Sequence, residues 1–281
     1  MVANFLFRIF NNCMKIMPIN EKTPIKQPSF GTCFRRYPYF RNKEFKHFSQ
    51  SVIRTSTNFF REDIDWQKLA KYVISHFKDK TEVKAYSLAC SDLSEAYTYS
   101  ISIMENTPKE LHKKFLPVYA SDIDSEILKM AQSDRVNIYN SEFATTEKLY
   151  NIHLDNYLKD SGVSISIKGD RFSDTDEMSS YRIIPILKSS VITKKSDILT
   201  ELSSLRDDGN SVIMCRNVFP YLSSKYINNV LEIASAKLKS GCLFVIGEYD
   251  KRAKGIDKEL LLKGFFNPLK DDFTSLIFEK R

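Results

Sequence analysis

Short apolar strands alternate with helices over most of the chain, and this alternation restricts the possible folds more than any other feature. Strands this short and this continuously apolar are typical of parallel sheets that helices cover on both faces. The sequence therefore predicts a doubly wound α/β sheet that ends in an antiparallel hairpin. The predicted strands are residues 83–89, 116–120, 190–193, 212–215, 242–247 and 273–278, the predicted helices are 63–77, 95–104, 125–131 and 224–239, and the hairpin joins 261–267 to 273–280.

An insertion is predicted around residues 140–181, because the alternation stops there and the sequence becomes polar and rich in Ser and Asp. One segment within it has Val163, Ile165 and Ile167 at every second position, as a half-buried strand does. We therefore expect the insertion to form a small antiparallel subdomain.

Positive charge is concentrated at the amino-terminal end of the chain. Residues 1–54 hold 10 Lys and Arg against 2 Asp and Glu, whereas residues 55–281 hold 32 against 33. Prolines among basic and aromatic residues predict that 1–54 is an extended arm, and that 55–281 is the folded domain. The arm is either a solvated segment or a contact for nucleic acid, an anionic membrane or an acidic partner.

The first 17 residues are apolar, but Arg8 interrupts them and no small-residue cleavage site follows, so a secretory signal fits poorly. They are either a short interfacial helix or lie upstream of a true start at Met14 or Met17, and we expect the fold to survive their deletion. No apolar run reaches the ~20 residues of a membrane-spanning helix. The 5 cysteines lack Cys-x-x-Cys spacing and the 4 histidines lack ligand spacing, which favours free thiols in a cytoplasmic protein and predicts no metal site.

Polar residues follow four of the predicted strands, at the edge where open α/β sheets bind ligands. An acid at the end of the second strand, here Asp122, can accept hydrogen bonds from both hydroxyls of a ribose, which suits a nucleoside cofactor. The structural alternative is a helix cap, a role that Asp124 or Ser125 can also fill. The four segments are residues 89–95, 121–124, 196–199 and 215–221.

Four sequence blocks together resemble the CheR-type chemotaxis receptor methyltransferases. The blocks are Thr57-Asn58-Phe59-Phe60-Arg61, Leu88-Ala89-Cys90-Ser91 with Glu95 and Tyr97, Ala120-Ser121-Asp122-Ile123-Asp124-Ser125-Glu126-Ile127-Leu128, and Met214-Cys215-Arg216-Asn217-Val218 with Tyr221. They occur in the family's order, and the predicted insertion falls where the family carries a small β-subdomain. The resemblance implies a mostly parallel, methyltransferase-type (Rossmann-like) sheet of about seven strands.

The resemblance also implies S-adenosylmethionine as the cofactor and a glutamate carboxylate of a protein as the methyl acceptor. Asp122 then holds the ribose, and Glu95 lies near the amino-acid end of the cofactor. Arg61 and Tyr221 are the implied catalytic residues: the block of Arg61 lies over the cofactor, and Tyr221 lies near the transferred methyl group. The implied cofactor-binding residues are Thr57, Arg61, Ala89, Cys90, Glu95, Asp122, Ile123, Asp197, Ile198, Asn217 and Val218.

The chemistry that the resemblance implies suits these residue types. A carboxylate acceptor is already deprotonated at neutral pH, so methyl transfer needs positioning and electrostatics and no general base. Arg61 can orient such a carboxylate with its planar fork. The structural alternatives are a surface ion pair of Arg61 with Glu62 or Asp65, and a core position for Tyr221 with a hydrated hydroxyl.

Three positions depart from the family's pattern. Leu93 stands where a glycine lets the backbone approach the cofactor, Ser94 replaces one of two acids, and Asp197 belongs to a block that usually offers an Asn. One alternative function is therefore a degenerate member that binds a protein partner without catalysis. Another is a methyltransferase with a different acceptor, such as RNA, guided by the basic arm; no contact with DNA is expected.

Overall fold

The computed structural model describes seven stretches of the chain, and everything below refers to them. Two short strands of the amino-terminal region, β1 (Arg35–Arg36) and β2 (Arg54–Thr55), pair antiparallel. The predicted arm and start sites otherwise lie outside the described residues, so the division of the chain at residue 54 stays a prediction. The described residues are 35–36, 54–55, 59–61, 63–165, 178–252, 255–266 and 275–281.

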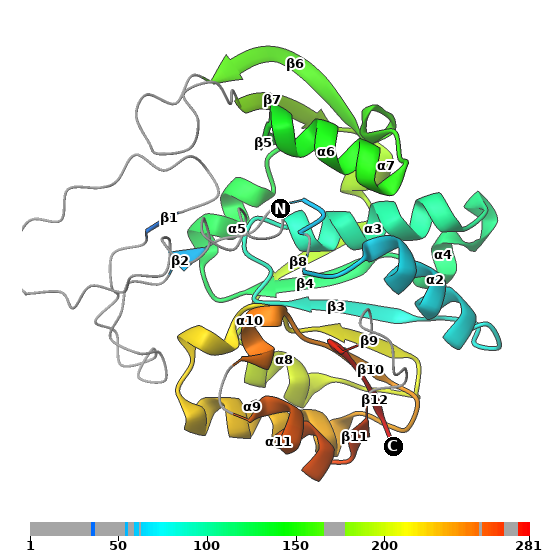
Figure 1. Cartoon of the computed structure of the whole chain (residues 1–281), viewed down its shortest axis with the longest axis vertical. Coiled ribbons are helices and arrows are strands. Elements are labelled where there is room, and N and C mark those ends of the chain that lie inside the picture. Colours follow the sequence, from blue (N-terminus) through cyan, green and yellow to red (C-terminus); the bar gives the residue numbers. More distant parts are fainter. Residues whose placement is uncertain are drawn as a thin grey trace, which may run out of the picture.

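A seven-stranded sheet forms the centre of the molecule, in the order β11-β12-β10-β9-β3-β4-β8 (Figure 1). Strands β3, β4, β8, β9 and β10 are parallel, and β12 runs antiparallel to both of its neighbours. The predicted doubly wound, mostly parallel sheet is therefore confirmed. The bounds are β3 (Lys84–Leu88), β4 (Val118–Asp122), β8 (Val191–Lys195), β9 (Ser211–Met214), β10 (Leu243–Val245), β11 (Phe265–Phe266) and β12 (Ile277–Lys280).

Helices cover both faces of this sheet, as its apolar strands require. Successive residues of β9 serve opposite faces, so Val212 and Met214 join one hydrophobic core while Ile213 joins the other. The first core contains residues of α2 (Trp66–His76), α3 (Ser94–Asn106) and α5 (Ser125–Ala131). The second contains residues of α8 (Ile198–Ser204), α9 (Ser224–Lys237) and α11 (Ile256–Leu262), which lie in the lower half of Figure 1.

The strand order changes direction at β3, since the chain adds β4 and β8 on one side and β9 and β10 on the other. Crossover loops on the two sides of such a point leave in opposite directions and open a crevice at the carboxyl ends of the strands. The ends of β3, β4 and β9 therefore bound the natural ligand site of this fold.

A second, antiparallel sheet has the order β5-β7-β6 and lies above the main sheet in Figure 1. It occupies the stretch where the sequence predicts an insertion, although its first strand begins before residue 140. Its elements are β5 (Arg135–Tyr139), α6 (Asn140–Tyr150), η3 (Leu154–Asn156), β6 (Leu158–Ile165), β7 (Met178–Ile183) and α7 (Pro185–Lys188). The remaining short elements are η2 (Lys109–Leu111), α4 (His112–Phe115), η4 (Phe219–Tyr221) and α10 (Glu248–Lys251).

The predicted carboxy-terminal hairpin needs a correction. Leu261 and Leu262 complete helix α11, and only Phe265–Phe266 pairs antiparallel with β12. Gly264, whose φ is +81°, ends the helix and turns the chain into the strand. Residues 267–274 lie outside the described ranges. Among the helices that the structure describes, not one has the length and hydropathy needed to cross a membrane.

Candidate cofactor and acceptor site

The loop that follows β3 takes an uncommon backbone course. Ala89, Ser91 and Leu93 all have left-handed φ values, of 57°, 52° and 72°. Leu93 thus keeps the backbone conformation that a glycine would adopt without strain. Its side chain is 1% exposed and packs into the hydrophobic core, so it does not intrude on the edge of the sheet.

Asp122 joins the loops that follow β3 and β4. Its Oδ2 accepts a hydrogen bond from the Ser91 backbone at 2.9 Å, and its Oδ1 accepts one from the Asp124 backbone at 2.9 Å. Burial raises the pKa of Asp122. Asp124 caps α5 by accepting from the Glu126 backbone at 2.9 Å, so the capping alternative applies to Asp124.

The block after β8 has a structural role in the described chain. Asp197 caps α8 by accepting from the backbone of Leu199 at 3.0 Å and of Thr200 at 3.1 Å, and it also accepts from the Tyr226 hydroxyl at 3.4 Å. Ile198 is buried in the second core. The places of Asp197 and Ile198 at the cofactor stay predictions.

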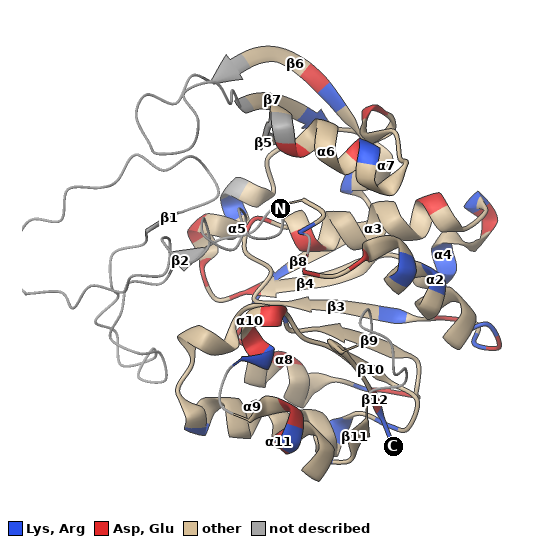
Figure 2. Cartoon of the chain, in the orientation of Figure 1, with Lys and Arg blue, Asp and Glu red and all other residues tan. Residues whose placement is uncertain are grey.

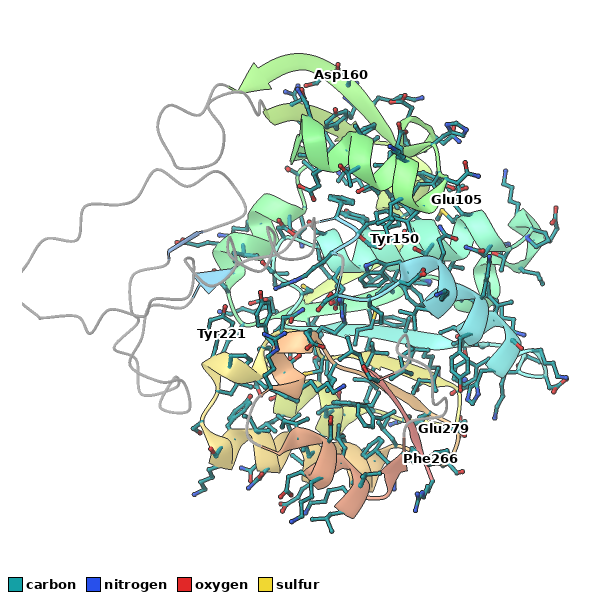
Figure 3. All side chains as sticks on the ribbon, viewed as in Figure 1. Glu105, Tyr150, Asp160, Tyr221, Phe266 and Glu279 are labelled. Carbon is teal, nitrogen blue, oxygen red and sulfur yellow. The ribbon has the colours of Figure 1, made fainter. Side chains whose placement is uncertain are left out.

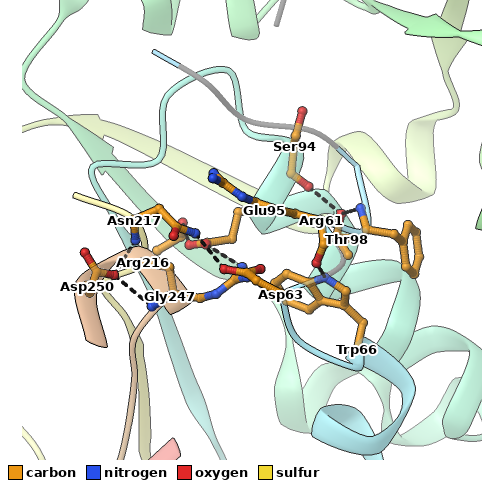
Figure 4. Close-up of polar contacts among 12 residues, drawn as sticks. Arg61, Asp63, Trp66, Ser94, Glu95, Thr98, Arg216, Asn217, Gly247 and Asp250 are labelled. Atoms are coloured by element: carbon orange, nitrogen blue, oxygen red, sulfur yellow. Dashed lines mark hydrogen bonds and ion pairs between the residues drawn. The ribbon is translucent and has the colours of Figure 1, made fainter. Parts of the chain in front are cut away.

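Arg216 is a buried charge at this edge, with two carboxylates and an aromatic ring around its guanidinium (Figure 4). Its Nη1 donates to Glu95 Oε2 at 2.9 Å, and its Nη2 donates to Asp63. The Trp66 ring covers the guanidinium, with 4.5 Å between Cζ and the ring centroid. Although burial opposes the charge, the two carboxylates raise the pKa of Arg216. Glu95 also accepts from Ser87 Oγ at 2.7 Å, so both of its oxygens have protein partners.

Asp63 is a residue that sequence reasoning missed. Besides Arg216, it accepts from Asn217 Nδ2 at 2.9 Å and from the Glu248 backbone at 3.3 Å. Burial alone would raise the pKa of Asp63, but nearby Arg216 and Arg61 outweigh it and lower that pKa. Its position two residues after Arg61 was the available signal, because an acid beside a matched block can contact the same site.

Asp250 is a second missed residue and is fully buried. It accepts hydrogen bonds from the backbone of Asn217, from Phe219 at 2.8 Å and from Gly247 at 2.7 Å. Burial raises its pKa to about 6, although these three N–H groups favour the charged form. A Cβ at Gly247 would lie 2.3 Å from Asn217 Oδ1, so a larger residue there would displace the Asn217 side chain.

Arg61 and Tyr221 reach the same edge from distant parts of the chain. The Arg61 carbonyl accepts from Trp66 Nε1 at 3.1 Å, and its guanidinium stands 5.4 Å from the centroid of the Tyr249 ring. Tyr221 lies in η4, which packs against α10 (Figure 3). Thr57 and Glu62, by contrast, lie outside the described residues.

The predicted site residues thus divide into two groups. Arg61 and Asn217 come together through Asp63, and Glu95 joins them through Arg216. Asp122 forms the second group, since it joins the loops that follow β3 and β4. The half-buried positions along this edge are Ala89, Ile123, Asn217, Val218 and Tyr221, whereas Cys90 is buried.

The charge at this edge suits a cationic ligand such as S-adenosylmethionine, which carries a sulfonium and an ammonium. Four carboxylates meet two guanidinium groups, and Figure 2 shows the acidic start of α10 beside the strand ends. Among the described residues, the buried atoms Asn217 Oδ1 and Arg216 Nε have no hydrogen-bond partner in the protein. The carboxylates are Asp63, Glu95, Asp122 and Asp250, and the guanidinium groups are Arg61 and Arg216. Within the same described part of the chain, no cluster of His, Cys, Asp and Glu could hold a metal ion.

Comparison with known proteins identifies the family. Residues 55–259 match the family model of the CheR methyltransferase SAM binding domain. A chemotaxis protein methyltransferase from Listeria monocytogenes is 24% identical over 213 residues, which cover 75% of this chain and 71% of that protein. Chemotaxis protein methyltransferase 2 from Vibrio cholerae is 24% identical over 79% of this chain and 72% of its own length. The chain therefore belongs to the CheR methyltransferase family and is an S-adenosylmethionine-dependent methyltransferase.

Proposed function

We propose that this enzyme transfers a methyl group to a glutamate side-chain carboxylate of a protein, and that the protein is a chemotaxis receptor. The observation that carries the proposal is the position of Arg61, a half-buried residue at the strand-end edge whose guanidinium lies over the Tyr249 ring. The names of the Listeria and Vibrio relatives support the same acceptor class.

Arg216 is an unsuitable group for contacting the acceptor. Its side chain is 1% exposed, and its two terminal nitrogens bond to Asp63 and Glu95. Arg61 is therefore the guanidinium that we assign to the acceptor carboxylate, which it would orient through a two-pronged hydrogen bond. Tyr221 would lie beside the same acceptor group from η4.

The cofactor supplies an activated methyl group, and a carboxylate needs no deprotonation before it attacks. The cysteines at this edge are unsuited to acting as nucleophiles, because burial raises the pKa of Cys90 and of Cys215 well above the usual range. We infer that Asp122 binds the ribose hydroxyls with the acceptor capacity left on its carboxylate. We also infer that residues 55–281 form the catalytic domain.

The test is methyl transfer from labelled S-adenosylmethionine to peptides that differ at one position, Glu, Gln or Asp. A glutamyl methyl ester is labile to alkali, so label on the Glu peptide should be released as methanol at high pH. Transfer to the Gln peptide, or alkali-stable label, would contradict a glutamate acceptor. Label transferred to RNA and resistant to alkaline ester cleavage would support the RNA alternative.

A binding titration tests the alternative that the protein is a degenerate family member, which binds a protein partner without catalysis. S-adenosylhomocysteine should bind to the purified protein, because Leu93, the departure that favoured lost binding, packs inward. Absence of binding to a folded protein would support a role as a binding module.

A further inference from the structure

Tyr249 belongs to none of the four sequence blocks that carry the family resemblance, yet its ring lies beside Arg61 at the strand-end edge. It is the second residue of α10 and is half-buried. Its ring lies 5.4 Å from Arg61 Cζ, within the distance of about 6 Å at which a guanidinium is attracted to an aromatic face.

Helix α10 is too short to be stable alone, so other parts of the chain must hold this ring in place. Asp250 bonds the Gly247 backbone at 2.7 Å and the Phe219 backbone at 2.8 Å, which joins the start of α10 to η4. The Glu248 backbone donates to Asp63 at 3.3 Å, which joins α10 to the segment that carries Arg61. The backbone of α10, which carries Tyr249, is therefore fixed relative to both η4 and the segment of Arg61.

The backbone of Arg61 is also fixed, through its carbonyl and the Trp66 indole at 3.1 Å. Its side chain has several rotatable bonds, and ordering a free arginine costs up to about 2 kcal/mol. A ring face can restrict the guanidinium while leaving its N–H donors in the guanidinium plane available to a carboxylate.

The electrostatics agree with this placement. Burial raises the pKa of Tyr249, while the positive charges of Arg61 and Arg252 act in the opposite direction. Tyr221 is close enough to influence the same phenol. Tyr249 thus neighbours both residues that the family resemblance implies to be catalytic, Arg61 and Tyr221.

We propose that Tyr249 is a positioning residue, whose ring face holds the Arg61 guanidinium where it meets the acceptor carboxylate. The proposal rests on the proposed function of Arg61. Attraction to a ring face needs the ring and not the hydroxyl. A phenylalanine at position 249 should therefore preserve the positioning of Arg61, whereas a leucine should not.

The first experiment measures methyl transfer to the Glu peptide by Tyr249→Phe and Tyr249→Leu. Tyr249→Leu should lower kcat/KM for the peptide by about 3- to 10-fold, the effect expected of one cation–π contact. Tyr249→Phe should stay within about 2-fold of the parent, and the KM for S-adenosylmethionine should stay within about 2-fold in both variants. Tyr119→Leu is the matched control, since it removes a partly exposed ring of β4 that stacks on Tyr86.

Equal losses in Tyr249→Phe and Tyr249→Leu would overturn the proposal in favour of the hydroxyl. A leucine variant as active as the parent would overturn it outright. A rise in the KM for S-adenosylmethionine alone would assign Tyr249 to the cofactor and would also contradict it.

The second experiment detects the contact between the Arg61 guanidinium and the Tyr249 ring directly, by NMR, and needs no acceptor peptide. The side-chain Nε–Hε resonance of Arg61, assigned by its loss in Arg61→Lys, should be shifted upfield by the ring in the parent and in Tyr249→Phe. In Tyr249→Leu it should move toward the position of an exposed arginine. If the resonance does not move, the positioning role is wrong. If it moves but the parent methylates no Glu peptide, the proposed acceptor is wrong while the contact stands.

Discussion

Two loops at the same sheet edge are held in different ways. The loop after β3 is shaped by its backbone, with three left-handed non-glycine residues and the Asp122 carboxylate as its brace. The corner after β9, residues 215–221, has one left-handed non-glycine residue, Asn217, and is held mainly by carboxylates from elsewhere in the chain, namely Asp63, Glu95 and Asp250. The corner after β9 therefore depends on side chains from three other segments, whereas the loop after β3 is braced mainly by the neighbouring strand β4.

The largest effect should come from Arg216→Met, which leaves Asp63 and Glu95 buried without their countercharge. Breaking such a pair typically costs about 3–5 kcal/mol, and we expect that loss in the free energy of unfolding, measured in urea. Adding Asp63→Asn and Glu95→Gln should recover part of it, because no unpaired charge then stays buried. A loss below about 1 kcal/mol would show that the corner is not held by these charges.

The ion pair of Asp63 with Arg216 predicts that the stability of the parent and the stability of Arg216→Met depend on pH in opposite ways. In the parent, the pKa of Asp63 is lowered in the fold, so its contribution to stability is present above its unfolded pKa and is lost as pH falls through the folded value. In Arg216→Met the main lowering cause is gone and burial raises that pKa. The variant should therefore gain stability relative to the parent as pH falls from about 8 to 5. Parallel pH profiles would contradict the assignment.

Asp250→Ala should be the next largest change, since three buried N–H groups lose their acceptor. At about 1 kcal/mol for each group, the free energy of unfolding should fall by about 3 kcal/mol. Asp208→Ala is the control, because Asp208 forms a surface ion pair with Lys239 at 3.0 Å and its removal should stay within about 0.5 kcal/mol. If the two variants unfold alike, Asp250 does not brace the corner.

Leu93→Gly tests the loop after β3 by setting strain against packing. Glycine relieves about 1 kcal/mol of left-handed strain, but removing a fully buried leucine costs about 2–5 kcal/mol. We expect a net loss of about 1–4 kcal/mol of stability, with the affinity for S-adenosylhomocysteine unchanged because the side chain faces the core. A gain in affinity above about 5-fold would show that Leu93 obstructs the cofactor.

The smallest expected change is that of Asp122→Ala, measured on cofactor binding. Loss of charge-assisted hydrogen bonds to the ribose should weaken binding by about 1–3 kcal/mol in a calorimetric titration of the folded variant. Asp124→Ala is a suitable control, because Asp124 caps α5 and should affect stability more than affinity. Unchanged affinity in Asp122→Ala would exclude the ribose role.

The central strands could be predicted because a strand that is buried on both faces appears in the sequence as a short continuous apolar run. Residues 212–215 were predicted and Ser211–Met214 is observed, a difference of one residue. Helix α10 was missed, and the strand before it was predicted to reach Gly247 although it ends at Val245. A four-residue polar helix has no periodic pattern to detect, and its hydrogen bonds to Asp63 and Asp250 come from its tertiary surroundings.

The sequence by itself determined the sheet, the order of the four family blocks and the placement of an acid, Asp122, at the end of β4. These follow from hydrophobic periodicity and motif spacing, which are local properties of the chain. Only the tertiary structure decided that Arg216 is enclosed by Asp63, 153 residues away, and that Leu93 faces inward. Which charges pair depends on how the strand order brings distant loops together, and no local pattern contains that information.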